Sequence, residues 1–364
     1  MGDIKVLQVG LSSYPGGVEN AIMNYFRFSD REKIHYDFLC TENSLAYSDE
    51  IEKSGGRIFY VPSLKKDIGA FKKKFSKLLR AEKYDVVHIN MLSAANIFPV
   101  VYAHRNHVKK IIVHAHNSYL PSGILKKTAH HLLKHTIGLF TKNFMACSPG
   151  AARWLFGSKK SKKAYILHNA VDYGRFSFNS EIRDVMRKKY GIDESTVVIG
   201  HVGRFNEEKN HKFLVELFCK YKKINRSSKL VLVGDGIMLD TVKKQVEDLG
   251  LVSDVIFVGS VSDASSYYQM MDLFCMPSHF EGLGIVAIEA QSSGLPCICS
   301  TGVPNEAIIS CAAKRISLDD NEKWLSEMVR MGKMPRISNM ERSLTEAGYN
   351  IICESKKLEN YYLE

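Results

Sequence analysis

The sequence lacks an uninterrupted apolar stretch long enough to span a bilayer, although 45% of its 364 residues are hydrophobic. Its first residues, 1 to 10, have the pattern of a strand and not that of a signal peptide. The sequence also has no low-complexity segment, no internal repeat and no recognisable nucleic-acid-binding module. We therefore expect a protein that stays in the cytoplasm.

Sequence patterns typical of a metal centre are missing too. The chain has eight scattered cysteines, and two of them, Cys297 and Cys299, are spaced to share one face of a strand as buried thiols. No Asp-x-Asp motif is present. His131 and His135 lie one helical turn apart, which is compatible with zinc, but no acidic or cysteine partner stands near them in the sequence. A solvated basic face is the favoured interpretation of this histidine cluster, and no metal is predicted.

Short β-rich runs alternate with helical patterns, which is typical of a parallel α/β sheet. A length of 364 residues favours two domains. The first series of strands is expected at residues 4–9, 36–40, 85–89, 110–114, 143–147 and 164–167, and the second at 197–203, 229–234, 255–259, 273–276 and 296–299. Two Rossmann-like domains follow from these two series.

Between the two series, a polar stretch from about Asp172 to Asp193 fits a linker that leads into a basic helix. We place the first domain at residues 1–175 and the second at 176–345. Residues 346–364 have a helical pattern.

The formal net charge is +11, and lysine runs concentrate the excess in the first half of the chain. An anionic partner is indicated, and a membrane surface is favoured over nucleic acid. Residues 125–144 place apolar side chains, among them Leu125 and Leu132, at helical spacing beside lysines and His130. The favoured interpretation is a core helix with a basic solvent face, and membrane docking is the alternative.

Two segments, one with paired glycines and one with two cations, follow expected strands. Gly16 and Gly17 precede a helical pattern, so their unhindered amides could approach a phosphate, although a tight turn is the commoner meaning of such a pair. Arg204 and Lys209 follow the strand at 197–203 and could neutralise a diphosphate.

Glu281 and Glu289 lie eight positions apart, with glycines at 282 and 284 between them. The glycines predict a loop that runs into a helix, with one carboxylate above the loop and the other inside the helix. Taken singly, each glutamate could be a solvated helix residue. As a pair behind Arg204 and Lys209 they predict a nucleotide-sugar site, in which the carboxylates hold ribose and hexose hydroxyls and the amides face the pyrophosphate.

With these motifs the chain resembles the retaining GT-B glycosyltransferases of family 4, over nearly its whole length. The resemblance rests on the Gly-Gly-Val-Glu loop, the segments 113–117 and 167–172, Arg204-x4-Lys209, Val233-Gly-Asp-Gly and Glu281-x7-Glu289. More narrowly, the chain is similar to bacterial enzymes that build exopolysaccharide or capsule. The resemblance implies two Rossmann-like domains that face each other across a cleft, with the acceptor on the first and the nucleotide-sugar on the second. It also implies that residues 346–364 complete the first domain.

The family pattern also implies a role for particular residues. It assigns Glu281 and His116 to the transferred sugar as catalytic residues, and Glu289 to the ribose. The donor diphosphate would be held by Arg204, Lys209, Gly16, Gly17, Gly284 and Ile285. Asp235 and Val261 would lie near the base, for which uridine is favoured on family frequency. No metal or other cofactor is implied.

The resemblance implies a retaining hexosyltransferase that acts on a glycan or a polyprenyl-diphosphate-linked acceptor. We keep two alternatives: a nucleotide-sugar epimerase on the same fold, and a catalytically silent nucleotide-sugar-binding scaffold. His116 could also be a structural residue at a strand end, with His114 pointing the same way, and His88 is expected to be structural. Acceptor specificity is expected from the loops at 90–96 and 117–123, whose meaning the sequence does not encode.

Overall fold

The structure is a computed structural model that describes residues 3–14, 16–64, 66–116 and 123–364. It divides into two compact units, each with its own sheet. Unit 1 comprises Met1–Ala170 and Ile351–Glu364, and unit 2 comprises Val171–Asn350. The sequence predicted that the first domain ends at residue 175 and resumes at residue 346; in the structure unit 1 ends at Ala170 and resumes at Ile351.

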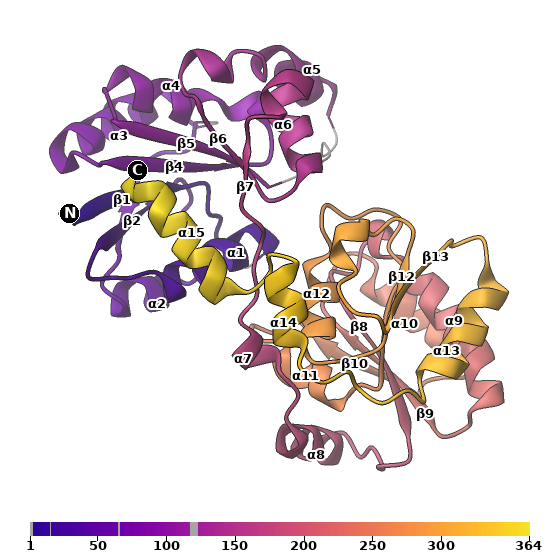
Figure 1. Ribbon diagram of the computed structural model, residues 1–364. Helices are drawn as coiled ribbons and strands as arrows, with labels where there is room; N and C mark the ends of the chain where they lie inside the picture. Colours follow the sequence, from indigo (N-terminus) through magenta and orange to yellow (C-terminus); the bar gives the residue numbers. More distant parts are fainter. Residues whose placement is uncertain (1–2, 15, 65, 117–122) are drawn as a thin grey trace. The chain divides into compact units, whose positions relative to one another are not determined.

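Unit 1 is a parallel sheet between two layers of helices (Figure 1). Its described strands follow the order β3-β2-β1-β4-β5-β6-β7. The elements are β1 (Ile4–Val9), α1 (Gly17–Phe28), β2 (Ile34–Cys40), α2 (Ser48–Lys53), β3 (Arg57–Tyr60), α3 (Ile68–Glu82), β4 (Val86–Met91), η1 (Ala94–Asn96), α4 (Phe98–Arg105), β5 (Lys110–Ala115), α5 (Ile124–Leu133), η2 (Ile137–Leu139), β6 (Asn143–Ala146), α6 (Pro149–Ser161), β7 (Tyr165–Ile166) and α15 (Ile351–Leu363).

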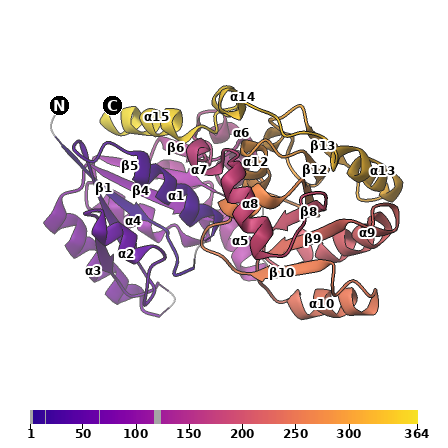
Figure 2. The same cartoon turned by 90° about the horizontal axis from the view of Figure 1, so that it is seen from below.

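The strands of unit 1 bury apolar side chains on both faces, as parallel strands must. One face packs against α3, α4 and α6, and the other packs against α1, α2 and α15. The C-terminal helix α15 therefore forms part of the core of unit 1. In both views it lies beside α1 and ends near the start of β1 (Figures 1 and 2).

Unit 2 has the same architecture. Its described strands follow the order β10-β9-β8-β11-β12-β13, and every pairing is parallel. The elements are α7 (Tyr173–Phe176), α8 (Ser180–Lys189), β8 (Val197–Val202), η3 (Glu207–Lys209), α9 (His211–Ile224), β9 (Ser228–Val233), α10 (Leu239–Asp248), β10 (Val255–Gly259), α11 (Ser265–Met270), β11 (Leu273–Met276), α12 (Ile285–Ser292), β12 (Cys297–Ser300), η4 (Asn305–Ala307), β13 (Ala313–Ile316), α13 (Asn321–Met331) and α14 (Met340–Glu346). Helices α9, α10 and α13 cover one face, while α7, α8, α11, α12 and α14 cover the other.

The predicted α/β class is confirmed, and all the expected strands are present. The sequence reading missed the two edge strands β3 and β13, whose residues are only partly buried and carry Arg57, Lys314 and Arg315. Cys297 and Cys299 are buried free thiols on β12, as expected.

The basic helix expected at the end of the segment from Asp172 to Asp193 is present as α8, with Lys188 and Lys189 in its last turn. The linker before it is wrong, because the segment also contains α7, and Phe176 and Met186 pack into the core of unit 2. Polar composition misled the prediction because the buried residues are few. One of them is a cation, Arg187, which is paired with Asp272.

The single helix expected over residues 125–144 is also wrong. Helix α5 ends at Leu133, and β6 begins at Asn143. Leu125 and Leu132 are exposed, whereas His130 is buried and stacks on Trp154 with ring centroids 4.1 Å apart. The face of α5 that packs against unit 1 is therefore not the one that hydrophobic periodicity indicated.

In both sheets the strand order reverses beside the first strand, between β1 and β4 in unit 1 and between β8 and β11 in unit 2. Loops at the carboxyl ends of such strands diverge and leave room for a ligand. In unit 2 the loops after β8 and β9 touch because Gly234, with φ of 140°, has no side chain; a Cβ there would lie 2.0 Å from the Gly203 carbonyl oxygen. Among the described residues, no helix has the length and apolarity needed to cross a bilayer.

Candidate active site

Arg204 and Lys209 lie in the loop that follows β8, at the switch point of unit 2. The Asn206 side chain accepts a hydrogen bond from the Lys209 backbone N–H (3.1 Å) and so begins the short helix η3. Phe205, between the two cations, is buried and stacks on His211 at a centroid distance of 3.9 Å. This packing leaves Arg204 exposed, with no side-chain partner among the described residues.

Lys209 Nζ lies 2.6 Å from Glu281 Oε1, from the loop after β11. The side chains are only 19% and 11% exposed, respectively, so the ion pair is largely shielded from solvent. The structure thus brings together a cation and a carboxylate that are 72 positions apart in the sequence. Because the pair is neutral, the net positive charge beside it comes from Arg204.

Gly284 and Ile285 begin helix α12. Gly284 has φ of 85° and ψ of 48°, a left-handed conformation that turns the loop into the helix. Within the described part of the chain, the N–H groups of residues 283 to 286 donate no backbone hydrogen bond outside the helix. Free amides at a helix N-terminus attract anions, so this end of α12 suits a phosphate group.

Glu289 lies one turn further into α12. Its Oε2 accepts a hydrogen bond from the Tyr268 hydroxyl of α11 (2.8 Å). Burial raises the pKa of Glu289 to about 7, and Asp263 adds to the increase, while the Tyr268 hydrogen bond and Arg175 oppose it. Arg175 and Asp263 themselves form an ion pair of 2.9 Å. Glu289 is therefore a carboxyl group that changes its charge close to neutral pH.

Asp235 and Val261 follow β9 and β10. The Asp235 carboxylate accepts from the Gly236 N–H (2.7 Å), and its backbone carbonyl accepts from the Phe205 N–H (2.9 Å). Asp235 therefore supports the loop that carries Arg204. Val261 packs, partly buried, against the apolar core of unit 2.

Gly16 and Gly17 begin α1 in unit 1. Asn20 N–H bonds the Gly16 carbonyl, while the amides of Gly16 and Gly17 donate no hydrogen bond within the described residues. Two carboxylates hold the preceding loop: Glu19 accepts from the N–H of Ser12 (3.1 Å), and Glu42 accepts from the N–H of Ser13 (3.0 Å). A phosphate at these glycines would gain free amides but would meet repulsion from both carboxylates.

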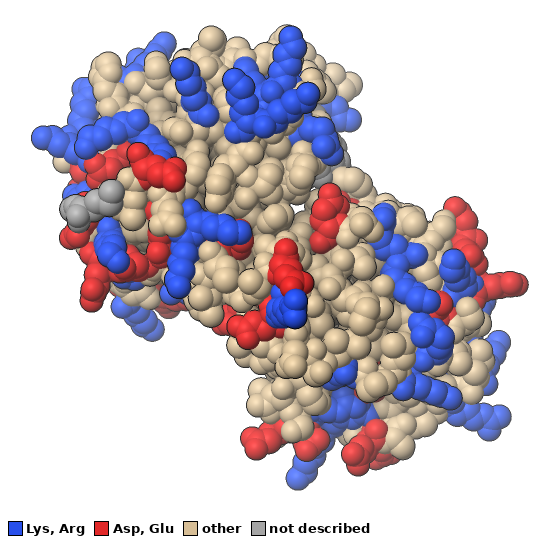
Figure 3. Space-filling view, viewed as in Figure 1, with Lys and Arg blue, Asp and Glu red and all other residues tan. Residues whose placement is uncertain are grey.

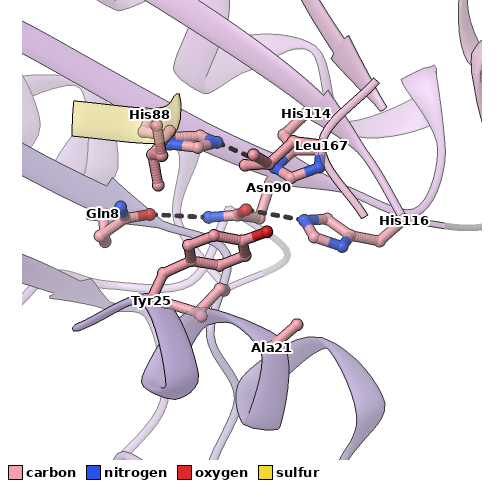
Figure 4. Close-up of a pocket in the computed structure, with 10 residues that line it drawn as sticks. Gln8, Ala21, Tyr25, His88, Asn90, His114, His116 and Leu167 are labelled. Atoms are coloured by element: carbon pink, nitrogen blue, oxygen red, sulfur yellow. Dashed lines mark hydrogen bonds between the residues drawn. The ribbon is translucent and has the colours of Figure 1, made fainter. Parts of the chain in front are cut away.

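His116 directly follows β5 in unit 1. Its Nε2 lies 2.8 Å from Asn90 Oδ1, and its ring lies 4.0 Å from that of His114, so the two histidines share a face as expected (Figure 4). Burial lowers the pKa of His116 to about 3, although Asn169 opposes the shift. His116 is thus neutral near pH 7.

Sequence reasoning missed Tyr268, Asn90 and the Arg175–Asp263 pair. A buried tyrosine two positions before Met270 gives no pattern that separates it from an ordinary core residue. Asn90 could have been found, because it ends a strand at the expected carboxyl edge of the sheet. The loop segment 117–122 that follows His116 lies outside the described residues.

Family models match both units of the chain. The family model described as Glycosyltransferase Family 4 matches residues 15–175, and the model described as Glycosyl transferases group 1 matches residues 182–334. The chain belongs to the family 4 glycosyltransferases, as the sequence motifs indicated, and it is a glycosyltransferase.

Individual relatives align along nearly the whole chain. It is 31% identical over 369 residues to the putative glycosyltransferase EpsF of Bacillus subtilis, which covers 98% of this chain and 96% of EpsF. It is 25% identical over 381 residues to the UDP-Gal:alpha-D-GlcNAc-diphosphoundecaprenol alpha-1,3-galactosyltransferase of Escherichia coli, with 99% and 97% covered.

Solved structures share the fold. HepE of Anabaena, crystallised in complex with UDP and glucose, superimposes with a TM-score of 0.78 at 15% identity and covers 98% of this chain and 99% of its own. A glycosyltransferase from Rickettsia africae gives 0.78 at 17% identity, with 100% and 98% covered. The two parallel α/β units are therefore those of the GT-B fold.

The raised pKa of Glu289 predicts a pH-dependent difference in stability. Stability that the protonated carboxyl contributes is present below its ordinary pKa of 4.5 and is lost as the pH rises through about 7. Glu289→Gln keeps an acceptor for Tyr268 but does not titrate. Relative to this variant, the wild-type melting temperature should fall between about pH 5 and about pH 8.

Thermal unfolding across this pH range measures the difference. Glu247→Gln, an exposed glutamate on α10, is the control and should melt in parallel with the wild type. A wild type that tracks Glu289→Gln at every pH would contradict the assignment.

Proposed function

We propose that the chain transfers a hexose-type sugar from a UDP-sugar, with retention of configuration, to a glycan or lipid-linked glycan in bacterial exopolysaccharide or capsule synthesis. In this proposal unit 2 binds the nucleotide-sugar and unit 1 binds the acceptor. The observation that carries it is the Lys209–Glu281 ion pair, which joins the loop after β8 to the loop that leads into α12; Arg204 is exposed on the first loop, and Glu289 lies one turn into α12. The UDP of the HepE structure and the UDP-galactose named for the Escherichia coli relative support the choice of donor.

The donor fits this grouping in a definite order. The diphosphate would face the N–H groups at the start of α12, with Arg204 and Lys209 as its counter-charges. Glu289, one turn further along α12, would accept hydrogen bonds from the ribose hydroxyls in its ionised form. Glu281 would contact the sugar while holding Lys209 in place.

The chemistry follows from where charge develops. As the bond between the anomeric carbon and the diphosphate oxygen breaks, that oxygen gains negative charge, which Arg204, Lys209 and the helix N-terminus stabilise more strongly than in the bound donor. The acceptor hydroxyl forms its bond on the face that the diphosphate leaves, and its proton passes to a diphosphate oxygen. This route needs neither a metal ion nor a side-chain nucleophile. Each charge-assisted hydrogen bond to the diphosphate contributes about 1.5 to 3 kcal/mol.

Membrane attachment at the inner face of the plasma membrane would suit a lipid-linked acceptor, and a basic surface of unit 1 supports it. From Val86 to Val171 the sequence contains no Asp or Glu. The same segment carries Arg105, Lys109, Lys110, Lys126, Lys127, Lys134, Lys142, Arg153, Lys159, Lys160, Lys162 and Lys163. Figure 3 shows Lys and Arg side chains, without acidic ones among them, over the face of unit 1 that carries α4, α5 and α6.

Apolar side chains project from the same surface. Ile124 and Leu125 at the start of α5 are 83% and 87% exposed, and Leu132 and Leu139 are 67% and 73% exposed. Exposed leucines beside lysines fit an interface of anionic headgroups over acyl chains. We call Ile124, Leu125, Leu132 and Leu139, together with their neighbouring lysines, the α5 surface.

Nucleotide binding should stabilise the folded protein. Saturating UDP, at about 100 times its dissociation constant, should add about 2.7 kcal/mol to the free energy of unfolding, with GDP, ADP and CDP giving less. The Arg204→Ala/Lys209→Ala double variant should lose this stabilisation. Thermal unfolding with each nucleotide measures it.

Arg204→Ala alone is the cleanest variant here, since Arg204 supports no other described side chain. Lys243→Ala/Lys244→Ala, two exposed lysines of α10, is the matched control and should respond to UDP as the wild type does. No response of the wild type to any nucleotide would favour a silent scaffold instead.

Glu281→Gln should lose sugar transfer by roughly a hundredfold or more while it keeps nucleotide affinity. Glutamine still offers an oxygen that holds Lys209 for the diphosphate, but it no longer presents a carboxylate to the sugar. A transfer assay with a UDP-sugar, followed by NMR of the product anomer, measures both rate and retention. Glu207→Gln, an exposed neighbour of Lys209 on η3, should transfer normally; unchanged transfer by Glu281→Gln would remove Glu281 from the mechanism.

The α5 surface should bind vesicles that contain phosphatidylglycerol and should release them in high salt. Each basic residue near an anionic surface contributes about 1 kcal/mol, so Lys126→Glu/Lys127→Glu should weaken binding by at least about tenfold. Cosedimentation measures the bound fraction. Lys243→Glu/Lys244→Glu carries the same charge change on unit 2 and should bind normally, while equal loss in both variants would argue against a docking role for α5.

A further inference from the structure

Six polar side chains form a connected network inside unit 1. They come from β1 (Gln8), β4 (His88 and Asn90), β5 and the residue after it (His114 and His116), and α15 (Tyr362). All except His116 are buried, with at most 8% exposed. Figure 4 shows Gln8, Asn90 and His116 in one row and His88 beside His114.

One backbone carbonyl fixes the direction of the hydrogen bonds around Asn90. Asn90 Nδ2 lies 3.1 Å from the Val9 carbonyl oxygen and 3.0 Å from Gln8 Oε1. A carbonyl oxygen can only accept, so the NH2 group of Asn90 must face Val9. Asn90 Oδ1 then faces His116 Nε2 at 2.8 Å and can only accept as well. His116 therefore carries its proton on Nε2.

The network continues from Gln8 to the other two histidines. Because Gln8 Oε1 accepts from Asn90, its Nε2 donates to the Tyr362 oxygen (3.0 Å). The Tyr362 hydroxyl also bonds the Tyr36 hydroxyl and His88 Nδ1 (2.6 Å), and His88 Nε2 lies 3.0 Å from His114 Nδ1. The C-terminal helix thus takes part in one hydrogen-bonded chain with His116.

Each of the three rings holds a single proton near neutral pH. Burial lowers the pKa of His88 and of His116 to about 3, and that of His114 is lowered further by burial and by its two histidine neighbours. With its proton on Nε2, His116 has a lone pair on Nδ1. Neither this nitrogen nor Oδ1 of the neighbouring Asn169 has a partner among the described residues. The Asn169 side chain interacts with the His116 ring, and its amide can supply a donor where no ligand is bound, so a bound hydroxyl would compete with Asn169 for the Nδ1 lone pair.

We propose that Asn90, Gln8 and Tyr362 are positioning residues that lock His116 in its Nε2–H form, so that Nδ1 accepts a hydrogen bond from a hydroxyl of the bound sugar. The assignment of His116 to the sugar rests on the proposed function. The direction of the hydrogen bonds does not, because it follows from Val9 and the network alone. A locked ring enters the reaction with its lone pair already oriented and needs no rearrangement.

Nitrogen NMR of histidine-labelled protein tests the lock without any substrate, because it reports which ring nitrogen carries the proton. The wild type should show His116 as a single Nε2–H form whose proton exchanges slowly with water. Asn90→Leu, which removes the acceptor, should lose that slow proton and should mix the two forms, while the signal of His201 in unit 2, whose Nδ1 bonds the Cys275 carbonyl, stays as an internal reference. A His116 proton on Nδ1 in the wild type, or an unchanged His116 in Asn90→Leu, would overturn the proposal.

Kinetics then test the consequence for transfer. Asn90→Leu should lower kcat by about tenfold or more, the effect of one lost hydrogen bond, with little change in the donor KM. Asn90→Asp keeps an acceptor but adds charge, so it should retain the Nε2–H form and move the acid limb of the pH–rate profile to higher pH. The groups that face His116 in that profile are His114, His88 and Asn169.

Two buried tyrosines of unit 1 give a matched comparison. Tyr362→Phe removes a hydroxyl from the network, whereas Tyr84→Phe removes one that bonds Asp37 outside it. Tyr362→Phe should lower kcat severalfold and Tyr84→Phe should not; equal effects would reduce Tyr362 to a packing role and overturn its part of the proposal. If NMR shows the Nε2–H form of His116 but no nucleotide binds, the proposed function is wrong and the positioning of His116 by Asn90 is still supported.

Discussion

The reversal of strand order in each parallel sheet is the constraint on which the candidate site residues of each unit depend. Parallel strands present their carboxyl ends at one edge, and the loops from two adjacent strands turn apart where the order reverses. In unit 2 those loops carry Arg204 and Glu281. In unit 1 the loops after β1 and β5 carry Gly16 and His116, and Asn90 lies near the carboxyl end of β4. Residues remote in sequence meet because the backbone hydrogen bonds of the sheet bring their strands together.

The two glutamates of the candidate site in unit 2 differ in their partners: Glu281 pairs with a lysine, and Glu289 bonds a tyrosine hydroxyl. Lys209 and Glu281 neutralise each other in a shielded ion pair, which leaves Arg204 and the α12 amides as the attraction for an anion. Glu289 has no such counter-charge in contact and is held by a tyrosine hydroxyl, so burial keeps it near its titration point. The site combines a fixed positive end with a carboxyl whose charge responds to pH.

In unit 1, burial lowers the pKa of histidines, whereas in unit 2 it raises the pKa of a carboxyl group. Unit 1 encloses neutral histidines whose protons are ordered by hydrogen bonds, and the last helix of the chain closes that network through Tyr362. Its outer surface over α4 to α6 is strongly basic because no acidic residue occurs between Val86 and Val171. An ordered neutral interior and a cationic exterior therefore come from the same stretch of sequence.

The sequence by itself determined the two α/β sheets, the family and the candidate residues, because strand periodicity and the Arg204-x4-Lys209 and Glu281-x7-Glu289 spacings are local signals. It failed where burial depends on distant partners. Residues 172–193 have the composition of a linker, but Phe176 and Met186 pack into the core of unit 2. On α5, Leu125 is exposed, whereas His130 is buried and stacks on Trp154. Only the tertiary structure decided that Lys209 pairs with Glu281, that Tyr268 holds Glu289, and that Val9 sets the proton on His116. Each of these depends on the distance and direction between groups far apart in the chain, which composition and spacing do not contain.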